Sequence, residues 1–382
     1  MLMNTQSISS PEDQKVTFVE LFFDLVFVFS VTQVVGLLHD SLDWIAVSQA
    51  ILVFWLVWWA WTQFTWALNA ADTTHYLVEL GALVATGVAF FMAVALPDAF
   101  HGRGLWFAIP YVLVRLIGLI LYAWVASENP SQRAAVQRFA VVSIGGLVAV
   151  LIGGIAGGAM QVWFWAFAIL LDVIAAAIGG QAEGWNLHPE HFGERHGLFV
   201  IIALGETLIV AAGGVTGVPW TGELITAAVL AVALTGGLWW SYFTQAKPEL
   251  DHALESSRGV AQSMLARDAF SLVHFPMLCG VIAYAVAVEE AIAHPAEPLP
   301  LEGRVMLAVG LALFVGGMAA AMWRATRRLL LPRLVLTVGT AIMIVVVAGV
   351  APLFTLAIAL AGIVVIAALE QRVGIYTYKH TS

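Results

Sequence analysis

Two carboxylates lie four residues apart in an apolar stretch near the start of the chain. Glu20 and Asp24 belong to the run VELFFDLVFVF, where a helix places both side chains on one face. Carboxylates this close together in surroundings of low dielectric tend to share a proton. We therefore expect a proton relay or a cation site here. The structural alternative is that Glu20 reaches the membrane interface and Asp24 pairs with Arg115.

Two further charged residues fall near the middle of long apolar stretches. Glu206, beside Gly205 in the run GLFVIIALGETLIV, is expected to serve a proton, a cation or a substrate. Its structural alternative is a protonated carboxyl bonded to a neighbouring helix. Arg115, in PYVLVRLIGLILY, keeps its charge and therefore requires a carboxylate partner. A structural ion pair and a clamp for an anionic substrate both remain open for Arg115.

Three secondary candidates have weaker patterns around them. Asp172 has no polar neighbour in its apolar stretch, which favours structural hydrogen bonding. Glu79 lies one turn inside its stretch, where water can hydrate it. His274 is followed by Pro276, and this pattern predicts a helix kink whose freed carbonyls face a cavity, or a kink without chemistry.

The segment HPEHFGERH, residues 188–196, concentrates ionisable side chains that include His191, Glu194 and Arg195. Histidine and carboxylate groups can bind a divalent metal, but these positions follow no established ligand spacing. Pro189 is expected to interrupt any helix in the segment. We therefore predict a solvated loop here in preference to a metal site.

The elements that carry these residues are predicted to be transmembrane helices. The chain has 382 residues, of which 61% are hydrophobic and 11% charged, with a mean hydropathy of +0.91. A helix of about 20 apolar residues crosses a bilayer core of about 30 Å. We predict an all-α integral membrane protein with about twelve spans, near residues 18–38, 44–66, 76–96, 104–125, 138–157, 160–180, 197–215, 222–243, 269–292, 304–323, 334–349 and 351–369.

The distribution of cations predicts the orientation of these spans. Most of the 16 Lys and Arg residues fall in the termini and the even-numbered loops, whereas the odd-numbered loops hold only Arg103 and Arg304. Because cytoplasmic loops are enriched in Lys and Arg, both termini are predicted to face the cytoplasm. The predicted cytoplasmic ends are an N-terminal segment, residues 1–17, and a tail, residues 371–382.

A weak internal repeat suggests two halves. Trp58-Trp59-Ala60-Trp61 in the second predicted span resembles Trp239-Trp240-Ser241-Tyr242 in the eighth. An even number of helices in each half gives parallel repeats related by an axis along the membrane normal. We place the first six-helix half at residues 18–190 and the second at residues 191–370. Chance matches between aromatic residues are the alternative.

Six ionisable residues besides histidine are predicted to lie at membrane depth, and all are acids except Arg115: Glu20, Asp24, Glu79, Arg115, Asp172 and Glu206. One Arg neutralises at most one or two acids, so the others must be protonated, hydrated or paired with a cation. This surplus predicts a secondary transporter or permease coupled to a proton or cation. A membrane enzyme or lipid-handling protein at the cytoplasmic headgroup level is an alternative, and a non-transporting sensor or scaffold is another.

Several functional classes are excluded by the sequence. No phosphate-binding G-x-x-x-x-G-K-[ST] motif occurs, and all three lysines fall outside the spans, which rules out a retinal Schiff base. The single cysteine, Cys279, rules out an internal disulfide or a cysteine metal cluster. We expect no cofactor, no metal and no nucleic acid partner, and we assign no catalytic residue. The expected partners are the lipid bilayer and a small solute or ion, and an oligomer is possible although nothing in the sequence supports one.

Several long motifs resemble those of the bacterial low temperature requirement A (LtrA) family. They include VELFFDLVFVFSVTQ, VWWAWTQFTW, HFGERHGLFVIIALGET and GGLWWSYFT. The resemblance implies a polytopic protein of the bacterial inner membrane that is named for a requirement in cold growth. It assigns no activity. The family pattern falls on Glu20, Phe23, Asp24, Trp58, Trp59, Arg115, Glu194, Arg195, Gly205, Glu206, Trp239, Trp240, His274 and Pro276.

Overall fold

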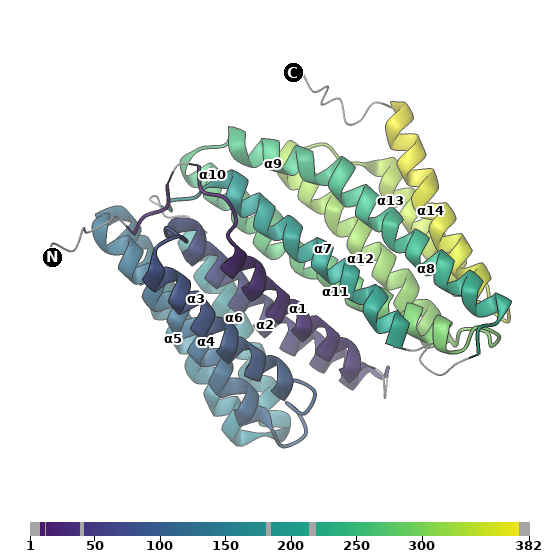
Figure 1. Cartoon of the computed structure of the whole chain (residues 1–382), viewed down its shortest axis with the longest axis horizontal. Helices are drawn as coiled ribbons and strands as arrows, with labels where there is room; N and C mark the ends of the chain where they lie inside the picture. The colour runs from purple at the N-terminus through teal and green to yellow at the C-terminus, as the bar shows by residue number, and fades with distance from the viewer. Residues whose placement is uncertain (1–7, 12, 39–41, 181–184, 214–218, 374–382) are drawn as a thin grey trace. The chain divides into compact units, whose positions relative to one another are not determined.

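The computed structural model describes residues 8–11, 13–38, 42–180, 185–213 and 219–373 (Figure 1). Within these ranges the chain is helical, and an isolated bridge between Ser9 and Ala71 is the only strand-like pairing. The predicted all-α class is therefore confirmed. Residues 1–7 and 12 of the predicted N-terminal segment, and residues 374–382 of the predicted tail, lie outside the described residues.

Apolar sequence sets the length of the helices, because a backbone in lipid must satisfy its polar groups within each segment. In the described part of the chain, 11 helical stretches are long and apolar enough to cross a membrane, and one shorter apolar helix adds to them. These confirm a multipass helical protein with about the predicted number of spans. The long helices are α1 (Phe18–Leu37), α2 (Trp44–Ala70), α3 (Tyr76–Ala95), α4 (Gly104–Val125), α5 (Pro130–Ala156), α6 (Gly158–Gly180), α7 (Pro189–Gly213), α8 (Gly222–Ser241), α11 (His274–Ala293), α12 (Leu301–Thr326) and α14 (Pro352–Val373).

The remaining elements are short. A 3-10 turn, η1 (Ala126–Glu128), links α4 to α5, and the short apolar helix is α13 (Leu331–Val346). Helix α8 runs through a π-helical segment, η2 (Tyr242–Ala246), into α9 (Lys247–Ser256). Likewise α10 (Gly259–Leu265) runs through a second π-helical segment, η3 (Ala266–Leu272), toward α11.

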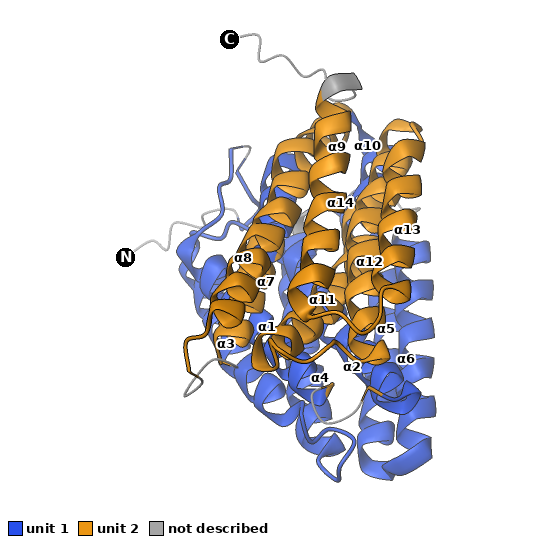
Figure 2. Ribbon diagram, turned by 90° about the vertical axis from the view of Figure 1, so that its right-hand side faces the viewer, with its two compact units in different colours: residues 1–37, 43–199, 257–267 blue, residues 38–42, 200–256, 268–382 orange. Residues whose placement is uncertain are grey.

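The chain divides into two compact units, coloured separately in Figure 2. Unit 1 comprises residues 1–37, 43–199 and 257–267, and unit 2 comprises residues 38–42, 200–256 and 268–382. Helix α7 contributes to both, since the division falls after Phe199. The predicted boundary between residues 190 and 191 lies in the first turn of α7. The division into two parallel repeats stays a prediction.

Unit 1 is built on helices that neighbour one another in sequence. Helix α1 packs on α2 and α3, α4 packs on α2, α3 and α5, and α5 packs on α6. Stacked rings fill the space between α1 and α2, where the Phe23 and Phe64 centroids lie 4.6 Å apart. This packing holds the charged face of α1 against α2.

Unit 2 has its most extensive packing between α11 and α12, with α13 on α12 and α14 on α8 and α13. The first of these pairs depends on two glycines. A Cβ on Gly310 would lie 2.8 Å from the Tyr284 backbone nitrogen and 2.9 Å from the Gly280 carbonyl oxygen. Glycine therefore allows the backbones of α11 and α12 to approach closely, as is common between membrane helices.

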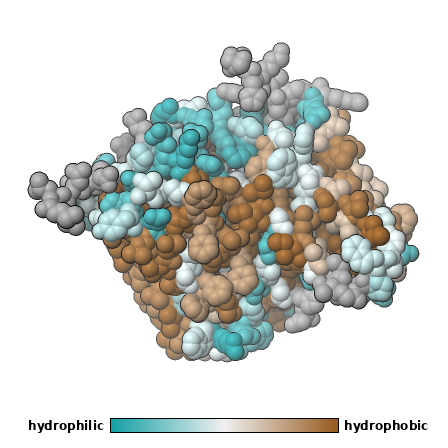
Figure 3. Space-filling model, in the orientation of Figure 1, coloured by the Kyte–Doolittle hydropathy of each residue, from teal (hydrophilic) through white to brown (hydrophobic). Residues whose placement is uncertain are grey.

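The surface also fits a membrane protein. Hydrophobic residues cover much of the face shown in Figure 3, while hydrophilic residues gather near its upper margin and lower edge. Many large apolar side chains are exposed, among them Phe91 at 65%, Trp106 at 73% and Ile155 at 73%. A soluble protein rarely exposes apolar surface on this scale, so lipid is the natural solvent for these helices.

Candidate functional site

The two carboxylates of α1 meet a guanidinium from α7 in unit 1. Arg195 Nη1 donates to Glu20 Oε1 at 2.6 Å. Arg195 also donates to Asp24, from Nη2 to Oδ1 at 2.5 Å and from Nε to Oδ2 at 3.1 Å. All three side chains are fully buried. One arginine therefore binds both acids that the sequence places on one face of α1.

Other groups complete this site, which we call the Arg195 cluster and define as Glu20, Asp24, His191 and Arg195. The Trp61 indole of α2 donates to Asp24 Oδ1 at 2.7 Å. The backbone N–H of Thr17 donates to Glu20 Oε2 at 2.9 Å, which is the bond that the third helical residue accepts from the N-cap residue in a capping box. The Thr17 hydroxyl donates to the same oxygen at 3.0 Å. His191 Nε2 lies 3.0 Å from Glu20 Oε1.

Hydrogen bonds from Asn69 fix the protonation state of His191. The Asn69 amide must point one way, because its oxygen accepts the His188 N–H at 2.9 Å and its nitrogen donates to the His188 carbonyl at 3.0 Å. The same nitrogen lies 2.9 Å from His191 Nδ1, which must therefore be the acceptor. His191 is then neutral, and its proton on Nε2 points at Glu20.

The charges of the Arg195 cluster do not balance. Two carboxylates face one guanidinium and one neutral imidazole, so the cluster carries one net negative charge when both acids are ionised. An uncompensated charge in a buried site is costly. Binding one proton would neutralise the cluster.

The local structure around residues 188–196 corrects our expectation of a solvated loop. Helix α7 starts at Pro189, where the ring is tolerated because the first helical N–H has no helical partner anyway. The i, i+4 spacing then places His191 and Arg195 on one face, opposite the i, i+4 acids of α1. His191 and Arg195 are buried, whereas Glu194 is exposed.

Arg115 belongs to a second buried cluster, separate from Asp24. Its Nη2 donates to Asp172 Oδ1 of α6 at 3.1 Å, and its Nη1 donates to the Tyr111 hydroxyl at 2.5 Å. Its Nε donates to the Gln63 side-chain oxygen of α2. The alternative that Asp24 pairs with Arg115 is therefore wrong. One guanidinium and one carboxylate balance here, which fits a structural ion pair.

The other predicted residues lie outside these two clusters. Helix α7 starts earlier than predicted, so Glu206 lies in its last third and not near the middle of a span. The Glu206 side chain is partly exposed, and a Cβ on Gly205 would meet no atom within 4 Å. Glu79 is exposed in the first turn of α3. His274 is buried in unit 2, where Nε2 accepts from the Tyr242 hydroxyl at 2.8 Å and Nδ1 donates to the Ala269 carbonyl at 2.9 Å.

Sequence reasoning ranked the central arginine too low and missed two of its neighbours. Arg195 was only a secondary candidate, since its segment was taken for a loop, although the spacing of His191 and Arg195 already matched that of Glu20 and Asp24. Trp61 and Asn69 gave no signal of their own among the many aromatic and polar residues of α2. Within the described residues, no group of His, Cys, Asp or Glu has the arrangement of a metal site.

Apolar helices that enclose buried charge clusters define a multipass membrane protein of the all-helical class. Residues 15–368 match the family described as bacterial low temperature requirement A protein (LtrA). The chain belongs to this family. It is also similar to a protein of Rhizobium meliloti (strain 1021), named uncharacterized protein RA0937, with 29% identity over 301 residues that cover 74% of this chain and 71% of the relative.

Proposed function

We propose that this LtrA-family protein is a secondary transporter coupled to protons, and that Asp24 is the group that binds the coupling proton. The observation that carries the proposal is the charge of the Arg195 cluster, where Glu20 and Asp24 share one guanidinium while Asn69 keeps His191 neutral. Gain and loss of one proton would switch this buried site between neutral and negative. A coupled carrier needs such a change of state as its site opens to either side.

The hydrogen bonds favour Asp24 over Glu20 as the proton acceptor. Both Glu20 oxygens already accept from strong or closely placed donors: Oε1 accepts from Arg195, and Oε2 accepts from Thr17 and from His191 Nε2 at 3.3 Å. Asp24 Oδ2 accepts one bond, from Arg195 Nε at 3.1 Å. A proton on this oxygen displaces the fewest donors, so Glu20 is the fixed anion and Asp24 the exchanging one.

The same geometry favours a proton over a metal cation. A metal ion needs carboxylate oxygens that are free to coordinate it. Each oxygen of Glu20 and Asp24 instead faces N–H or O–H groups, which would have to turn away first. A proton needs no coordination shell and only one oxygen. The balanced Arg115–Asp172 pair has no such surplus, and we assign it to the stability of unit 1.

The test measures proton movement directly, because the transported solute is not identified. Purified protein is reconstituted into liposomes that contain a pH-sensitive dye, and a potassium diffusion potential is imposed with valinomycin. Wild type and Asp24→Asn are compared, since asparagine resembles the protonated carboxyl but cannot release a proton. Glu79→Gln is the matched control, because it removes an exposed carboxylate from the same unit.

The expected result is a proton flux well above that of protein-free liposomes for wild type and Glu79→Gln. Asp24→Asn should fall to the level of the protein-free liposomes while it keeps the wild-type elution volume in size-exclusion chromatography. A wild-type proton flux that Asp24→Asn leaves unchanged would overturn the proposal.

A further inference from the structure

A buried arginine in unit 2 has donors that its partners leave unused. Arg333 lies in the first turn of α13 and pairs with Glu370 of α14, from Nε to Oε1 at 2.6 Å and from Nη2 to Oε2 at 2.8 Å. Its Nη2 also donates to Gln245 Oε1 at 3.1 Å and reaches Ser241 Oγ at 3.3 Å. Among the described residues, Nη1 has no hydrogen-bond partner, although Arg333 is only 1% exposed.

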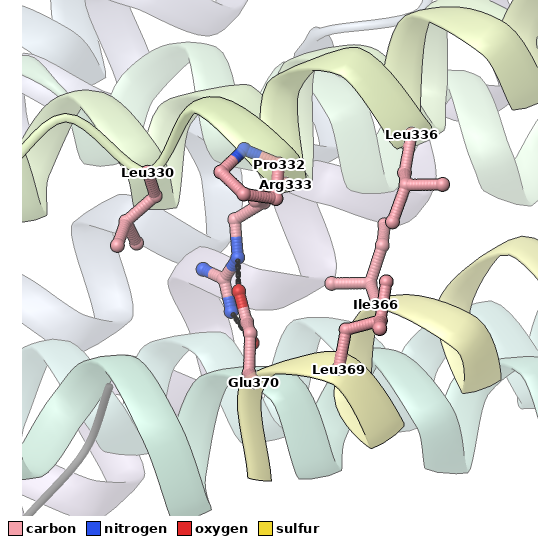
Figure 4. Close-up of a pocket in the computed structure, with 7 residues that line it drawn as sticks. All are labelled: Leu330, Pro332, Arg333, Leu336, Ile366, Leu369 and Glu370. Atoms are coloured by element: carbon pink, nitrogen blue, oxygen red, sulfur yellow. Dashed lines mark hydrogen bonds and ion pairs between the residues drawn. The ribbon is translucent and has the colours of Figure 1, made fainter. Parts of the chain in front are cut away.

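A small cavity lies beside the Arg333 side chain (Figure 4). Its volume is about 20 Å³, and apolar side chains line it together with the Arg333–Glu370 pair: Leu330, Pro332, Leu336, Ile366 and Leu369. A space of this size holds one water-sized atom. We call it the Arg333 pocket. Its lining combines one charged hydrogen-bond donor, which could bind a single oxygen atom, with apolar side chains that could contact an apolar part of the same ligand.

The Arg333 pocket lies at the ends of its helices. Arg333 is two residues after the start of α13, and Glu370 is three residues before the end of α14. At a rise of about 1.5 Å per residue, both are within about one turn of the helix ends. For helix α14, which is long and apolar enough to cross a bilayer, a residue this close to the helix end falls where the headgroups and the first acyl carbons meet.

Two exposed arginines precede the Arg333 pocket in the chain. Arg333 and Glu370 neutralise each other, but Arg327 and Arg328 are exposed on the connection that leads into α13. Helix α13 also starts without a side-chain cap, and the positive end of its dipole lies beside the pocket. An anion is therefore favoured over a neutral acceptor.

We propose that the Arg333 pocket binds one phosphate oxygen of an anionic phospholipid. Arg333 Nη1 donates to this oxygen, while the exposed faces of Pro332 and Leu369 contact the start of the acyl chains. Arginine is well suited to phosphate, because its fork of donors can bind a carboxylate on one edge and a second acceptor on the other. The proposal does not depend on proton coupling.

Native mass spectrometry of the detergent-purified protein tests the site. Phosphatidylglycerol and phosphatidylcholine with identical acyl chains are added separately, and the fraction of protein that retains each lipid is measured. Two variants change the pocket differently: Arg333→Lys keeps the charge beside Glu370 but removes the second donor group, and Leu369→Trp fills the cavity while it leaves the ion pair intact. Arg304→Lys is the matched control, because Arg304 is in the same unit and binds the backbone oxygens of Val345 and Val347.

Wild type and Arg304→Lys should retain phosphatidylglycerol several-fold more than phosphatidylcholine, and both pocket variants should lose this preference. A separate sample with excess inorganic phosphate distinguishes a lipid site from a general anion site, since free phosphate should not displace the lipid. Equal retention of the two lipids by wild type, wild-type retention by both pocket variants, or displacement by inorganic phosphate would each overturn the proposal.

Discussion

Arg195 donates two hydrogen bonds to Asp24, from Nε to Oδ2 at 3.1 Å and from Nη2 to Oδ1 at 2.5 Å. This edge-on geometry leaves Nη1 for Glu20, and the Arg195 guanidinium also lies over the Trp61 ring, 5.8 Å from its centroid. Each of its three nitrogens thus donates to a carboxylate, and the side chain is fully buried. Arg195 is therefore expected to hold the two acids in place.

Replacement of Arg195 by glutamine should strongly destabilise the protein. Arg195→Gln leaves two buried carboxylates without a cation, and breaking a buried ion pair from one side costs about 3–5 kcal/mol. The free energy of unfolding is measured by denaturant titration in detergent micelles. Arg324→Gln serves for comparison, because Arg324 and its partner Asp268 are partly exposed and such pairs contribute at most about 1 kcal/mol. Equal losses of stability in the two variants would contradict the larger contribution expected from the buried ion pairs of Arg195.

The two acids of α1 should respond differently to the same change of carboxylate to amide. In Asp24→Asn the remaining oxygen still accepts from Trp61 and Arg195, and the new amide nitrogen meets a single donor, Arg195 Nε. In Glu20→Gln the new amide nitrogen meets donors at either position. In place of Oε1 it faces Arg195 Nη1 with His191 Nε2 nearby, and in place of Oε2 it faces the Thr17 N–H and His191 Nε2. A buried donor without an acceptor costs about 1–3 kcal/mol, so Glu20→Gln should be less stable than Asp24→Asn by about that amount.

Thermal unfolding of both variants in the same detergent checks this ranking. An Asp24→Asn protein that is as unstable as Glu20→Gln would mean that Asp24 Oδ2 is as firmly bound as the oxygens of Glu20. The hydrogen bonds would then no longer favour Asp24 over Glu20 as the group that exchanges the proton.

The sequence predicted the fold well because the relevant signals are local. The length of each apolar run and the rise of a helix suffice to place the spans, and Glu20 and Asp24 share a face of α1 by spacing alone. The start of α7 was misjudged for a physical reason. Pro189 interrupts a helix from within but is well tolerated in its first turn, and single-sequence patterns do not show which case applies.

The pairing of charges could not be predicted, because it depends on contacts between distant parts of the chain. Arg195 and Asp24 are 171 residues apart, and Arg115 and Asp172 are 57 apart. From composition, Arg115 was the only intramembrane cation available to Asp24. The structure adds Arg195 to the buried cations, which reduces the expected surplus of acid to one uncompensated charge in the Arg195 cluster.

Removal of both members of the Arg115–Asp172 pair should cost less than removal of either one. Arg115→Met or Asp172→Leu alone leaves an uncompensated buried charge, with a cost of about 3–5 kcal/mol, whereas an apolar replacement of both partners is often nearly neutral. A double-mutant cycle on the free energy of unfolding measures the coupling. If the two losses simply add, Arg115 and Asp172 do not act as a pair in the membrane-embedded protein.

The close approach of α11 and α12 predicts a large difference between two glycines of α12. In Gly310→Ala the new methyl group would lie 2.8 Å from the Tyr284 backbone nitrogen and 2.9 Å from the Gly280 carbonyl oxygen, so the two helices must move apart. In Gly316→Ala the methyl group meets no atom within 4 Å. Forcing extra volume into a packed interface costs about 1–3 kcal/mol, and more where the obstacle is backbone.

Gly316→Ala should keep or slightly raise the stability, because alanine favours a helix more than glycine does by about 1 kcal/mol. Thermal unfolding in detergent separates the two variants, and the yield of folded protein after solubilisation provides a second measure. A Gly310→Ala protein as stable as Gly316→Ala would show that α11 and α12 are not in backbone contact at this point. The contact between α11 and α12 would then be made by side chains and not by the two backbones.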